Sequence, residues 1–576
     1  MPPTSADYLV GTLAAAGVPR IYGVPGDSLN GVTDALRRRG SPAWVHVRHE
    51  EAAAFAASAE AQLTGRLAVC AGSCGPGNLH LINGLYDAYR SRVPVLAIAA
   101  HIPSAEIGSG YFQETRPTEL FRGCSDFCEL VSGPEPLPRL LAIAVRTAVA
   151  RRTVSVLVLP GDVALAGAVA EPAAPALPSA RPSVTPTEAD LGRIAEVLNR
   201  GGKVTIFAGV GCADARAELL ALAARLRAPI VHSIRGKEYV EWDNPFDVGM
   251  TGLLGFSSGY HAMRSCDTLV LLGTDFPYRQ FYPERATIVQ VDLRGEQIGR
   301  RCAVDVGVVG DVRSTLAALL PRLTPVSDDA HLTSSLEQYR STRAKLDDLA
   351  VGPAGTQPVH PQYLTRQIDA AAPANAIFTV DVGTPTIWAA RYLRFNGQRR
   401  LVGSFVHGSM AGALSQAIGA QSSAPDRTVV ALCGDGGLAM LLGELLTLHQ
   451  HALPVKVVVF NNGALDFVEL EMISAGFAPF ATDLVNPDFA GIARASGLLG
   501  LTIGRPGEVA PALAAAFAHP GPALIDAKVF RQEVAMPPSV TAAMAKGFGL
   551  FALKAVLSGR GSEIVDLAKT NLFRGE

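Results

Sequence analysis

Short, continuously apolar runs alternate with alanine- and leucine-rich amphipathic stretches along most of the chain. The apolar runs lie at residues 67–71, 93–99, 154–159, 204–208, 268–272 and 455–460. Strands of this kind, separated by helices, are typical of a parallel sheet that helices cover on both faces. The pattern therefore predicts an α/β protein built from doubly wound parallel sheets.

Two stretches interrupt this rhythm. Residues 164–187 are rich in proline and alanine, and residues 324–361 are polar and then rich in glycine and proline, so we interpret both as linkers. The chain has 576 residues, more than the roughly 250–300 at which a single core stops growing. We therefore expect three doubly wound domains and a C-terminal amphipathic helical tail, at residues 1–182, 183–334, 335–530 and 531–576.

Composition and charge exclude several classes of protein. Apolar residues make up 48% of the chain, charged residues 18%, and the net charge is −2, which argues against general disorder and against nucleic acid as a partner. Residues 1–13 are too polar for a secretory signal, and no apolar run is long enough to span a bilayer. The eight cysteines are scattered, and no second ligand pair accompanies Cys124 and Cys128. We expect a cytoplasmic protein with reduced thiols.

Hard oxygen ligands follow two of the expected strands. Gly434, Asp435, Gly436 and Gly437 follow the strand at residues 429–433, and Asn461 and Asn462 follow the strand at 455–460. Ligands bind outside the carboxyl ends of parallel strands, so Asp435 and Asn462 are expected to meet. Carboxylate and amide oxygens suit Mg²⁺, and the glycines let backbone N–H groups approach phosphates. The alternative is a pair of ordinary loops, because Gly-Asp-Gly and Asn-Asn are both common turns.

The order and spacing of these two halves resemble the signature of the thiamine-diphosphate-dependent 2-oxo-acid decarboxylases and oxidases. The resemblance implies that Asp435, Asn462 and the carbonyl of Ala464 hold Mg²⁺. It also implies a set of residues that bind thiamine diphosphate, with Met410 as the apolar prop: Gly408, Ser409, Met410, Asp435, Gly436, Gly437, Asn462, Gly463, Ala464, Leu465, Asp466, Phe467 and Val468.

Thiamine diphosphate requires a carboxylic acid beside its aminopyrimidine ring. Glu50 follows His49 at the start of an expected helix, and the resemblance assigns this role to Glu50. The alternative is that Glu50 and Glu51 merely favour a helix N-terminus. Because Glu50 and Asp435 belong to different domains, the resemblance implies a site between two subunits of a homo-oligomer, usually a tetramer.

Further segments resemble parts of the same family. Phe112 and Gln113 match a segment beside the reacting carbon, although core packing is the alternative for Phe112; Phe467 and Glu471 match residues that flank the cofactor in oxidases. The middle domain lacks Gly-x-Gly-x-x-Gly, because Asp214 replaces the third glycine, so a nicotinamide site is not expected. It resembles instead the FAD domain of the pyruvate oxidase group through Thr251, Gly252, Leu253, Leu254, Thr274, Asp275, Phe276, Pro277, Tyr278 and Asp292.

The tail repeats apolar residues at helical spacing over residues 546–557, with a lysine at each end. Such segments lie in a bilayer interface, and docking on the protein's own body is the alternative. Nearly the whole chain resembles the quinone-dependent members of the pyruvate oxidase group, in which the tail binds phospholipid. Two departures from that group are Asp466, where close relatives have glycine, and the terminal residues after Phe573.

The resemblance implies a peripheral enzyme on the inner face of the cell membrane. It would decarboxylate pyruvate oxidatively to acetate and CO₂ and pass electrons through FAD to ubiquinone or menaquinone. One alternative is a carboligase of the acetolactate synthase type. The other is a catalytically degenerate, membrane-recruited binding protein, against which the intact Glu50, Asp435 and Asn462 argue.

Overall fold

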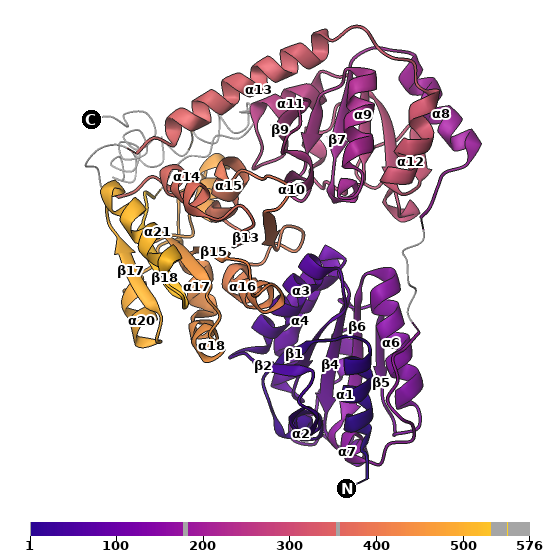
Figure 1. Cartoon of the computed structure of the whole chain (residues 1–576), viewed down its shortest axis with the longest axis vertical. Helices are drawn as coiled ribbons and strands as arrows, with labels where there is room; N and C mark the ends of the chain where they lie inside the picture. Colours follow the sequence, from indigo (N-terminus) through magenta and orange to yellow (C-terminus); the bar gives the residue numbers. More distant parts are fainter. Residues whose placement is uncertain (1, 177–182, 353–357, 532–549, 551–576) are drawn as a thin grey trace.

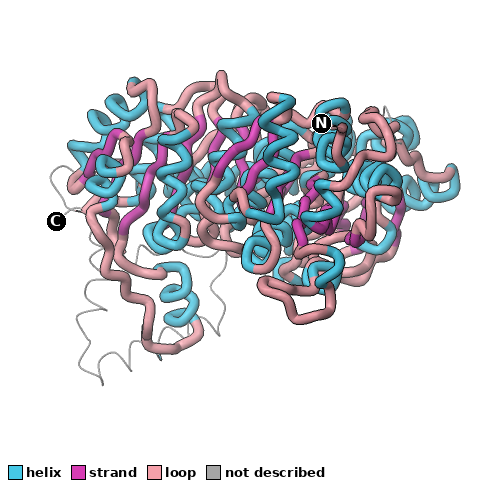
Figure 2. The backbone as a smooth tube through the Cα atoms, turned by 90° about the horizontal axis from the view of Figure 1, so that it is seen from below, coloured by secondary structure: helices cyan, strands magenta, loops and turns pink. Residues whose placement is uncertain are grey.

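The computed structural model describes residues 2–176, 183–352, 358–531 and 550. Three six-stranded sheets, in which all paired strands are parallel, form three domains of the described chain (Figure 1). Helices flank the strands on both faces (Figure 2). The expected α/β class with three parallel sheets is confirmed.

The N-terminal sheet has the order β2-β1-β3-β4-β6-β5. Its strands are β1 (Arg20–Gly23), β2 (Ala43–His46), β3 (Ala68–Gly72), β4 (Val95–His101), β5 (Phe127–Leu130) and β6 (Val154–Pro160). Its helices are α1 (Ser5–Ala15), α2 (Asn30–Arg39), α3 (Glu50–Thr64), α4 (Pro76–Ser91), α5 (Pro117–Leu120), α6 (Leu137–Arg151) and α7 (Gly161–Leu165).

The C-terminal sheet, β14-β13-β15-β16-β18-β17, repeats that order strand for strand. Its strands are β13 (Ile377–Val380), β14 (Arg400–Gly403), β15 (Val429–Gly434), β16 (Lys456–Asn461), β17 (Leu499–Ile503) and β18 (Ala523–Lys528). Its helices are α14 (Pro361–Ala371), α15 (Thr384–Tyr392), α16 (Gly412–Ser423), α17 (Asp435–Met440), α18 (Leu445–Gln450), α19 (Asp466–Ser474), α20 (Phe489–Ala495) and α21 (Val509–Ala518).

The middle sheet has a different order, β12-β11-β10-β7-β8-β9. Read from the β9 edge and numbered within the domain, this order is 3-2-1-4-5-6. It is the order of dinucleotide-binding folds, although the glycine fingerprint is absent. The strands are β7 (Val204–Ala208), β8 (Ile230–His232), β9 (Asp247–Met250), β10 (Thr268–Leu272), β11 (Thr287–Asp292) and β12 (Val306–Val309). The helices are α8 (Glu188–Asn199), α9 (Arg216–Leu226), α10 (Lys237–Val240), α11 (Ser257–Arg264) and α12 (Val312–Leu319).

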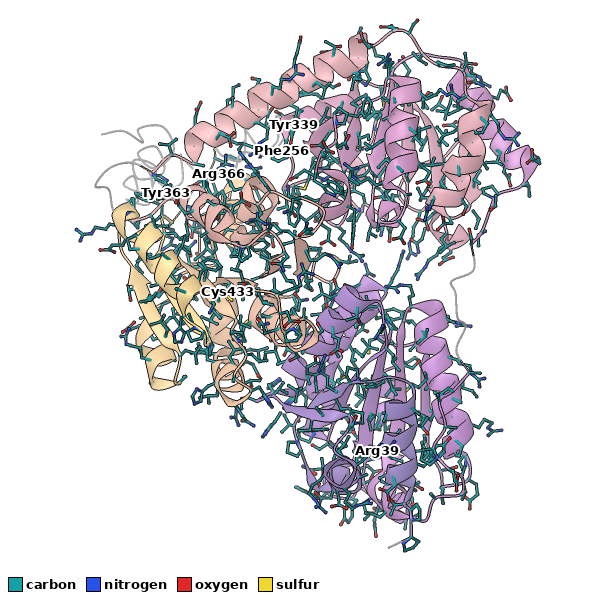
Figure 3. The ribbon with its side chains drawn as sticks, in the orientation of Figure 1. Arg39, Phe256, Tyr339, Tyr363, Arg366 and Cys433 are labelled. Atoms are coloured by element: carbon teal, nitrogen blue, oxygen red, sulfur yellow. The ribbon has the colours of Figure 1, made fainter. Side chains whose placement is uncertain are left out.

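The expected linker at residues 324–361 needs correction, because it contains the 20-residue helix α13 (Ala330–Leu349). The helix runs across the expected boundary at residue 334 and lies along the middle and C-terminal domains (Figure 1). A narrow apolar stripe holds it: Leu332 and Leu346 are buried, and Tyr339 packs on Phe256 with ring centroids 6.1 Å apart (Figure 3). The polar composition of the other faces concealed this stripe.

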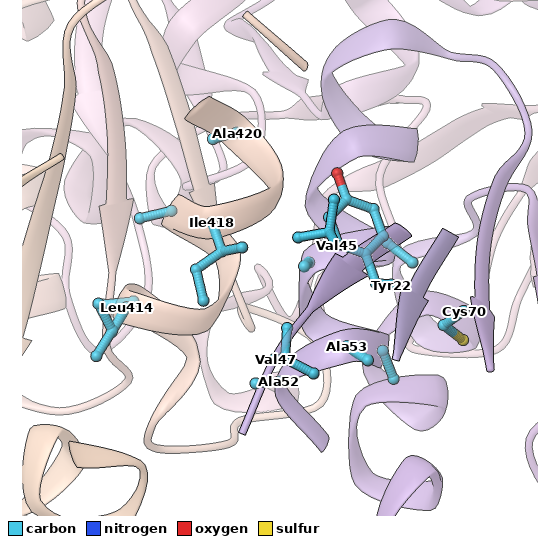
Figure 4. Packing of buried hydrophobic residues seen from close by; sticks show 14 of the residues in the cluster. Tyr22, Val45, Val47, Ala52, Ala53, Cys70, Leu414, Ile418 and Ala420 are labelled. Carbon is cyan, nitrogen blue, oxygen red and sulfur yellow. The ribbon is translucent and has the colours of Figure 1, made fainter. Parts of the chain in front are cut away.

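The N- and C-terminal domains share one hydrophobic core where α3 crosses α16. Alanines 52 and 53 of α3 belong to the same buried cluster as Leu414 and Ile418 of α16 (Figure 4). Gly419 permits the close crossing, because a Cβ atom there would lie 2.0 Å from the carbonyl oxygen of Ala56.

The expected tail lies outside the described residues, apart from Leu550. None of the helices in the described ranges is long and apolar enough to cross a membrane.

Candidate functional site

The two halves of the expected diphosphate motif meet at the carboxyl edge of β15 and β16. Asp435 follows β15, and its Oδ2 accepts hydrogen bonds from the Gly463 N–H and the Asn486 side chain, both at 2.7 Å. Its Oδ1 accepts from the Gly436 N–H at 2.8 Å. β13 and β15 are neighbours on either side of the point where strand order reverses, which is where α/β sheets bind ligands.

The donor set at this edge fits a hard divalent cation. The Asp435 residue is 3% exposed, burial raises the pKa of its carboxyl, and no lysine, arginine or histidine of the described chain forms an ion pair with it. The Asn462 side-chain oxygen faces the Ala464 N–H at 3.1 Å. A buried carboxylate beside amide and carbonyl oxygens suits Mg²⁺, whose charge would compensate the burial.

Two glycines lie beside this cluster where neighbouring side chains pack against the backbone. A Cβ atom on Gly436 would lie 2.9 Å from Leu465 Cδ2 and 3.3 Å from Met410 Cε. A Cβ atom on Gly437 would lie 2.3 Å from the carboxylate of Asp381. Glycine is therefore needed at both positions for this close approach of side chains to the backbone.

The segment after Asn462 leads from the Asp435 cluster into α19. Gly463 has φ +70°, Ala464 bridges to Asp483, and Asp466 begins α19 as a buried acid, a favourable place for its charge at a helix N-terminus. Of the next two residues, Phe467 packs on the C-terminal core and Val468 is 40% exposed.

The segment 404–410 is fixed by its own backbone. Gly408 has φ +85°, and the N–H groups of Gly408 and Ser409 donate to the carbonyl and hydroxyl oxygens of Ser404, the latter at 3.1 Å. Ser409 also accepts a hydrogen bond from Asn83 of α4 at 2.9 Å. This stretch therefore lies where the C-terminal domain meets α4.

Glu50 begins α3, as the sequence predicts, and its side chain faces the first turns of α4. His49 caps the helix, since its Nδ1 accepts from the Glu51 N–H at 3.2 Å. The Glu50 residue is 7% exposed, and its Oε2 lies 2.9 Å from His80 Nδ1. The His49 and His80 rings stack at 4.3 Å. Burial, followed by the charge of the neighbouring His80, lowers the pKa of His49.

Of the other candidate contacts of the N-terminal domain, Gln113 bonds to the β3–α4 loop. Gln113 has φ +63° and accepts a hydrogen bond from the Cys74 thiol at 3.2 Å. Phe112 is 77% exposed, so core packing within the described chain does not account for it.

Among the described residues of one chain, no hydrogen bond or ion pair joins Glu50 to the Asp435 cluster. Among the described residues, His80 is the hydrogen-bond partner of the Glu50 carboxylate, and the link toward the C-terminal domain runs through its neighbour Glu51. Asn83 donates to Glu51 at 2.7 Å and to Ser409.

A cavity of about 480 Å³ collects the segments expected to bind FAD. It also reaches Gly408, Phe467 and Glu471 of the C-terminal domain, so it extends to the edge of the diphosphate side. The expected residues that line it are Thr251, Gly252, Leu253, Leu254, Thr274, Asp275, Phe276, Pro277, Tyr278 and Asp292.

Four arginines that the sequence did not indicate line the wall of this cavity: Arg90, Arg92, Arg235 and Arg301. Arg301 and Arg92 pair with Asp275 at 2.8 and 3.3 Å, and burial raises the pKa of Asp292. Cations beside acidic groups at the ends of β10 and β11 fit a nucleotide with phosphates and ribose hydroxyls. Arg92 comes from the N-terminal domain, so the motif of the middle domain could not reveal it.

Two further residues of the diphosphate side were missed. Asp381 follows β13 as Asp435 follows β15; it accepts from the N–H groups of Ala413 and Gly434, and burial raises its pKa to about 7. The same rule about strand ends would have found it. The Asn486 side chain donates a hydrogen bond to Asp435 from a distant loop, and no local sequence pattern indicates this contact.

Comparison with known proteins gives consistent matches along the chain. Three family models match: the N-terminal TPP binding domain of thiamine pyrophosphate enzymes at residues 3–120, the central domain at 191–319, and the C-terminal TPP binding domain at 381–527. The putative thiamine pyrophosphate-containing protein YdaP of Bacillus subtilis is 35% identical over 98% of each chain.

Two relatives with named activities are about equally similar. An acetolactate synthase large subunit of Parasynechococcus marenigrum is 31% identical over 93% of this chain and 89% of that protein. The pyruvate oxidase of Lactiplantibacillus plantarum is 29% identical over 90% of this chain and 88% of that protein.

Proposed function

The chain belongs to the thiamine pyrophosphate (thiamine diphosphate) enzyme family, and from this premise we propose that it is a pyruvate:quinone oxidoreductase. The overall reaction converts pyruvate, water and a quinone into acetate, CO₂ and the quinol. FAD is the electron carrier between the 2-oxo acid and ubiquinone or menaquinone.

The C-terminal domain holds the diphosphate end of the coenzyme. Asp435, Asn462 and the Ala464 carbonyl bind Mg²⁺, the backbone at Gly436 and Gly437 meets the phosphates, and Met410 supports the coenzyme from its apolar side. When bound, thiamine diphosphate supplies the carbon acid that adds to a 2-oxo acid and the sink for the electron pair released with CO₂.

The N-terminal domain supplies the acid. Glu50 holds a proton at its carboxyl beside the aminopyrimidine ring, and His80 at 2.9 Å orients that carboxyl. Gln113 and Phe112 contact the 2-oxo acid from the neighbouring loop.

The single observation that supports an oxidative reaction is the continuity of the cavity. One cavity is lined by the middle-domain segments expected to bind FAD and by Phe467 and Glu471 of α19. The helix α19 begins shortly after Asn462, an expected ligand of Mg²⁺. FAD bound there would supply the two-electron acceptor that the oxidation needs.

The proposed function also requires a homo-oligomer and binding to a membrane. Glu50 serves the coenzyme held by a second copy in a homo-oligomer, a tetramer by family resemblance. This is consistent with the absence of a hydrogen bond to Asp435 among the described residues and with the exposure of Phe112. Residues 531–576 bind phospholipid at the inner face of the cell membrane, where the quinone is dissolved; the support is their amphipathic sequence.

Acetolactate synthesis is the second candidate, since that relative is as similar as the pyruvate oxidase. Anaerobic addition of pyruvate to protein loaded with thiamine diphosphate, Mg²⁺ and FAD separates the two. We expect bleaching of the flavin with one acetate per flavin. Acetolactate with the flavin still oxidised favours the second candidate, and absence of CO₂ release leaves a degenerate binding protein.

The membrane role has its own test. Phospholipid vesicles containing ubiquinone are added to the full chain and to a chain that ends at residue 546. We expect faster quinone reduction by the full chain only; equal rates contradict a role for the tail.

A further inference from the structure

Three residues of the segment 444–451 hold residues 46–49 of the N-terminal domain. Glu444 Oε1 accepts hydrogen bonds from the N–H groups of Arg48 and His49, both at 2.9 Å. Gln450 accepts from the Arg48 guanidinium at 2.6 Å, and His451 Nε2 accepts from the His46 N–H at 3.1 Å. We call Glu444, Gln450 and His451 the clamp.

Glu444 is the buried member of the clamp. The residue is 1% exposed, and its second oxygen accepts from the Thr447 hydroxyl at 2.6 Å. No ion pair to it occurs among the described residues, and burial raises its pKa to about 7. A buried carboxylate is costly unless hydrogen bonds compensate it. Here the compensation comes from two consecutive backbone N–H groups of another domain, so the interaction fixes backbone and not only side chains.

The held backbone leads directly into Glu50. Arg48 and His49 are the last two residues before α3, and His49 caps that helix. Fixing both amides fixes the helix start, and with it the direction in which the Glu50 side chain leaves the backbone. An error of about 1 Å in a reacting group can cost about a hundredfold in rate.

We propose that Glu444 is a positioning residue for Glu50. The C-terminal domain, through one carboxylate, sets the place of the acid that the N-terminal domain presents to the coenzyme. The inference rests on the proposed function, because Glu50 has a chemical task only beside thiamine diphosphate. Glu444 touches neither coenzyme nor substrate in this scheme.

The test compares Glu444→Ala and Glu444→Gln in the full chain loaded with thiamine diphosphate, Mg²⁺ and FAD. The matched control is Glu238→Ala: Glu238 is also buried, and accepts from the Leu401 N–H at 2.8 Å across a different domain boundary. Hydrogen exchange is followed at residues 46–52, and kcat and KM are measured for pyruvate decarboxylation.

For Glu444→Ala we expect exchange at residues 48 and 49 to rise about tenfold or more. We expect kcat to fall about 10- to 100-fold while KM for pyruvate changes less than about threefold. Glu444→Gln keeps an oxygen that can accept both N–H groups, so kcat stays within about threefold of wild type. Glu444→Asp, whose carboxylate is one methylene shorter, replaces Glu444→Ala if that chain does not fold, with an intermediate loss expected.

Unchanged exchange at residues 48 and 49 in Glu444→Ala overturns the proposal, and so does a kcat within about twofold of wild type. An equal fall in kcat for Glu238→Ala also overturns it, because domain docking in general would then be responsible. If the wild-type chain releases no CO₂ from 2-oxo acids, the proposed function fails, whereas the exchange measurement still decides whether Glu444 holds the start of α3.

Discussion

Glu50 and Glu51 are neighbours in the sequence but have different partners in space. Glu50 faces His80, and Glu51 accepts from Asn83. We expect Glu50→Gln to lower kcat for pyruvate decarboxylation about 10²- to 10⁴-fold, because a proton-holding acid is lost. Glu51→Gln, the matched control, should stay within about threefold, and similar losses in both would contradict the role given to Glu50.

Asp435 is the residue on which the metal proposal depends. Asp435→Asn removes the charge that faces Mg²⁺, so the affinity for thiamine diphosphate with Mg²⁺ should fall about tenfold or more in calorimetric titration. Chelation of Mg²⁺ should weaken coenzyme binding to the wild-type chain similarly. Asp426→Asn, at an exposed turn after α16, is the control and should bind normally.

At the scale of elements, the crossing of α3 and α16 depends on one glycine. Gly419→Ala would place a methyl group 2.0 Å from the Ala56 carbonyl oxygen, so the helices must separate. We expect the free energy of unfolding to fall by about 1–3 kcal/mol in urea titrations. Gly192→Ala, on the exposed face of α8 with no atom within 4 Å of the added methyl, should instead stabilise by about 0.5–1 kcal/mol. A neutral Gly419→Ala would show that the crossing is loose.

Strands β8 and β9 bring His232 and Asp247 together in the middle domain, with Nε2 and Oδ1 3.4 Å apart. Burial lowers the pKa of His232 to about 4 and raises that of Asp247 to about 8, from 6.5 and 3.8 respectively. Between pH 4 and 6.5 the two effects on stability oppose each other, since unfolding adds a proton to His232 and removes one from Asp247.

Above pH 6.5, Asp247 is the member of this pair that still makes the free energy of unfolding depend on pH. Its folded state keeps a proton that the unfolded state has lost, so stability falls as the pH rises toward 8. The expected slope is about 1.4 kcal/mol per pH unit, measured as the shift of the urea midpoint of the middle domain. Asp247→Asn should remove this slope, and its persistence in that variant would assign it to other groups.

At the scale of the whole molecule, the N- and C-terminal domains repeat one strand order and present separate halves of a site. Glu50 lies on one and Asp435 on the other, without a hydrogen bond or ion pair between their clusters among the described residues. If a second copy completes each site, co-expressed Glu50→Gln and Asp435→Ala chains should regain up to about a quarter of wild-type activity, because mixed dimers contain one intact site. Activity no higher than that of either variant alone would place the complete site within one chain.

The sequence by itself determined the class of fold and the chemistry of the diphosphate edge. Strands 204–208 and 268–272 match β7 and β10, and those expected at 67–71, 93–99 and 455–460 are displaced by only one or two residues, because buried parallel strands are short apolar runs. Asp435 and Asn462 were found because both follow such runs. The helix α13 was not, because its apolar stripe is narrow and its composition polar.

Only the tertiary structure decided which distant segments meet. Asn486 at Asp435, Arg92 at the middle-domain cavity and Glu444 at the start of α3 all join residues far apart in the chain. Local patterns record periodicity and turn chemistry over a few residues, whereas these contacts follow from how whole domains pack. The residue types that carry the chemistry can thus be identified from local sequence, whereas their arrangement in space depends on how the domains pack together.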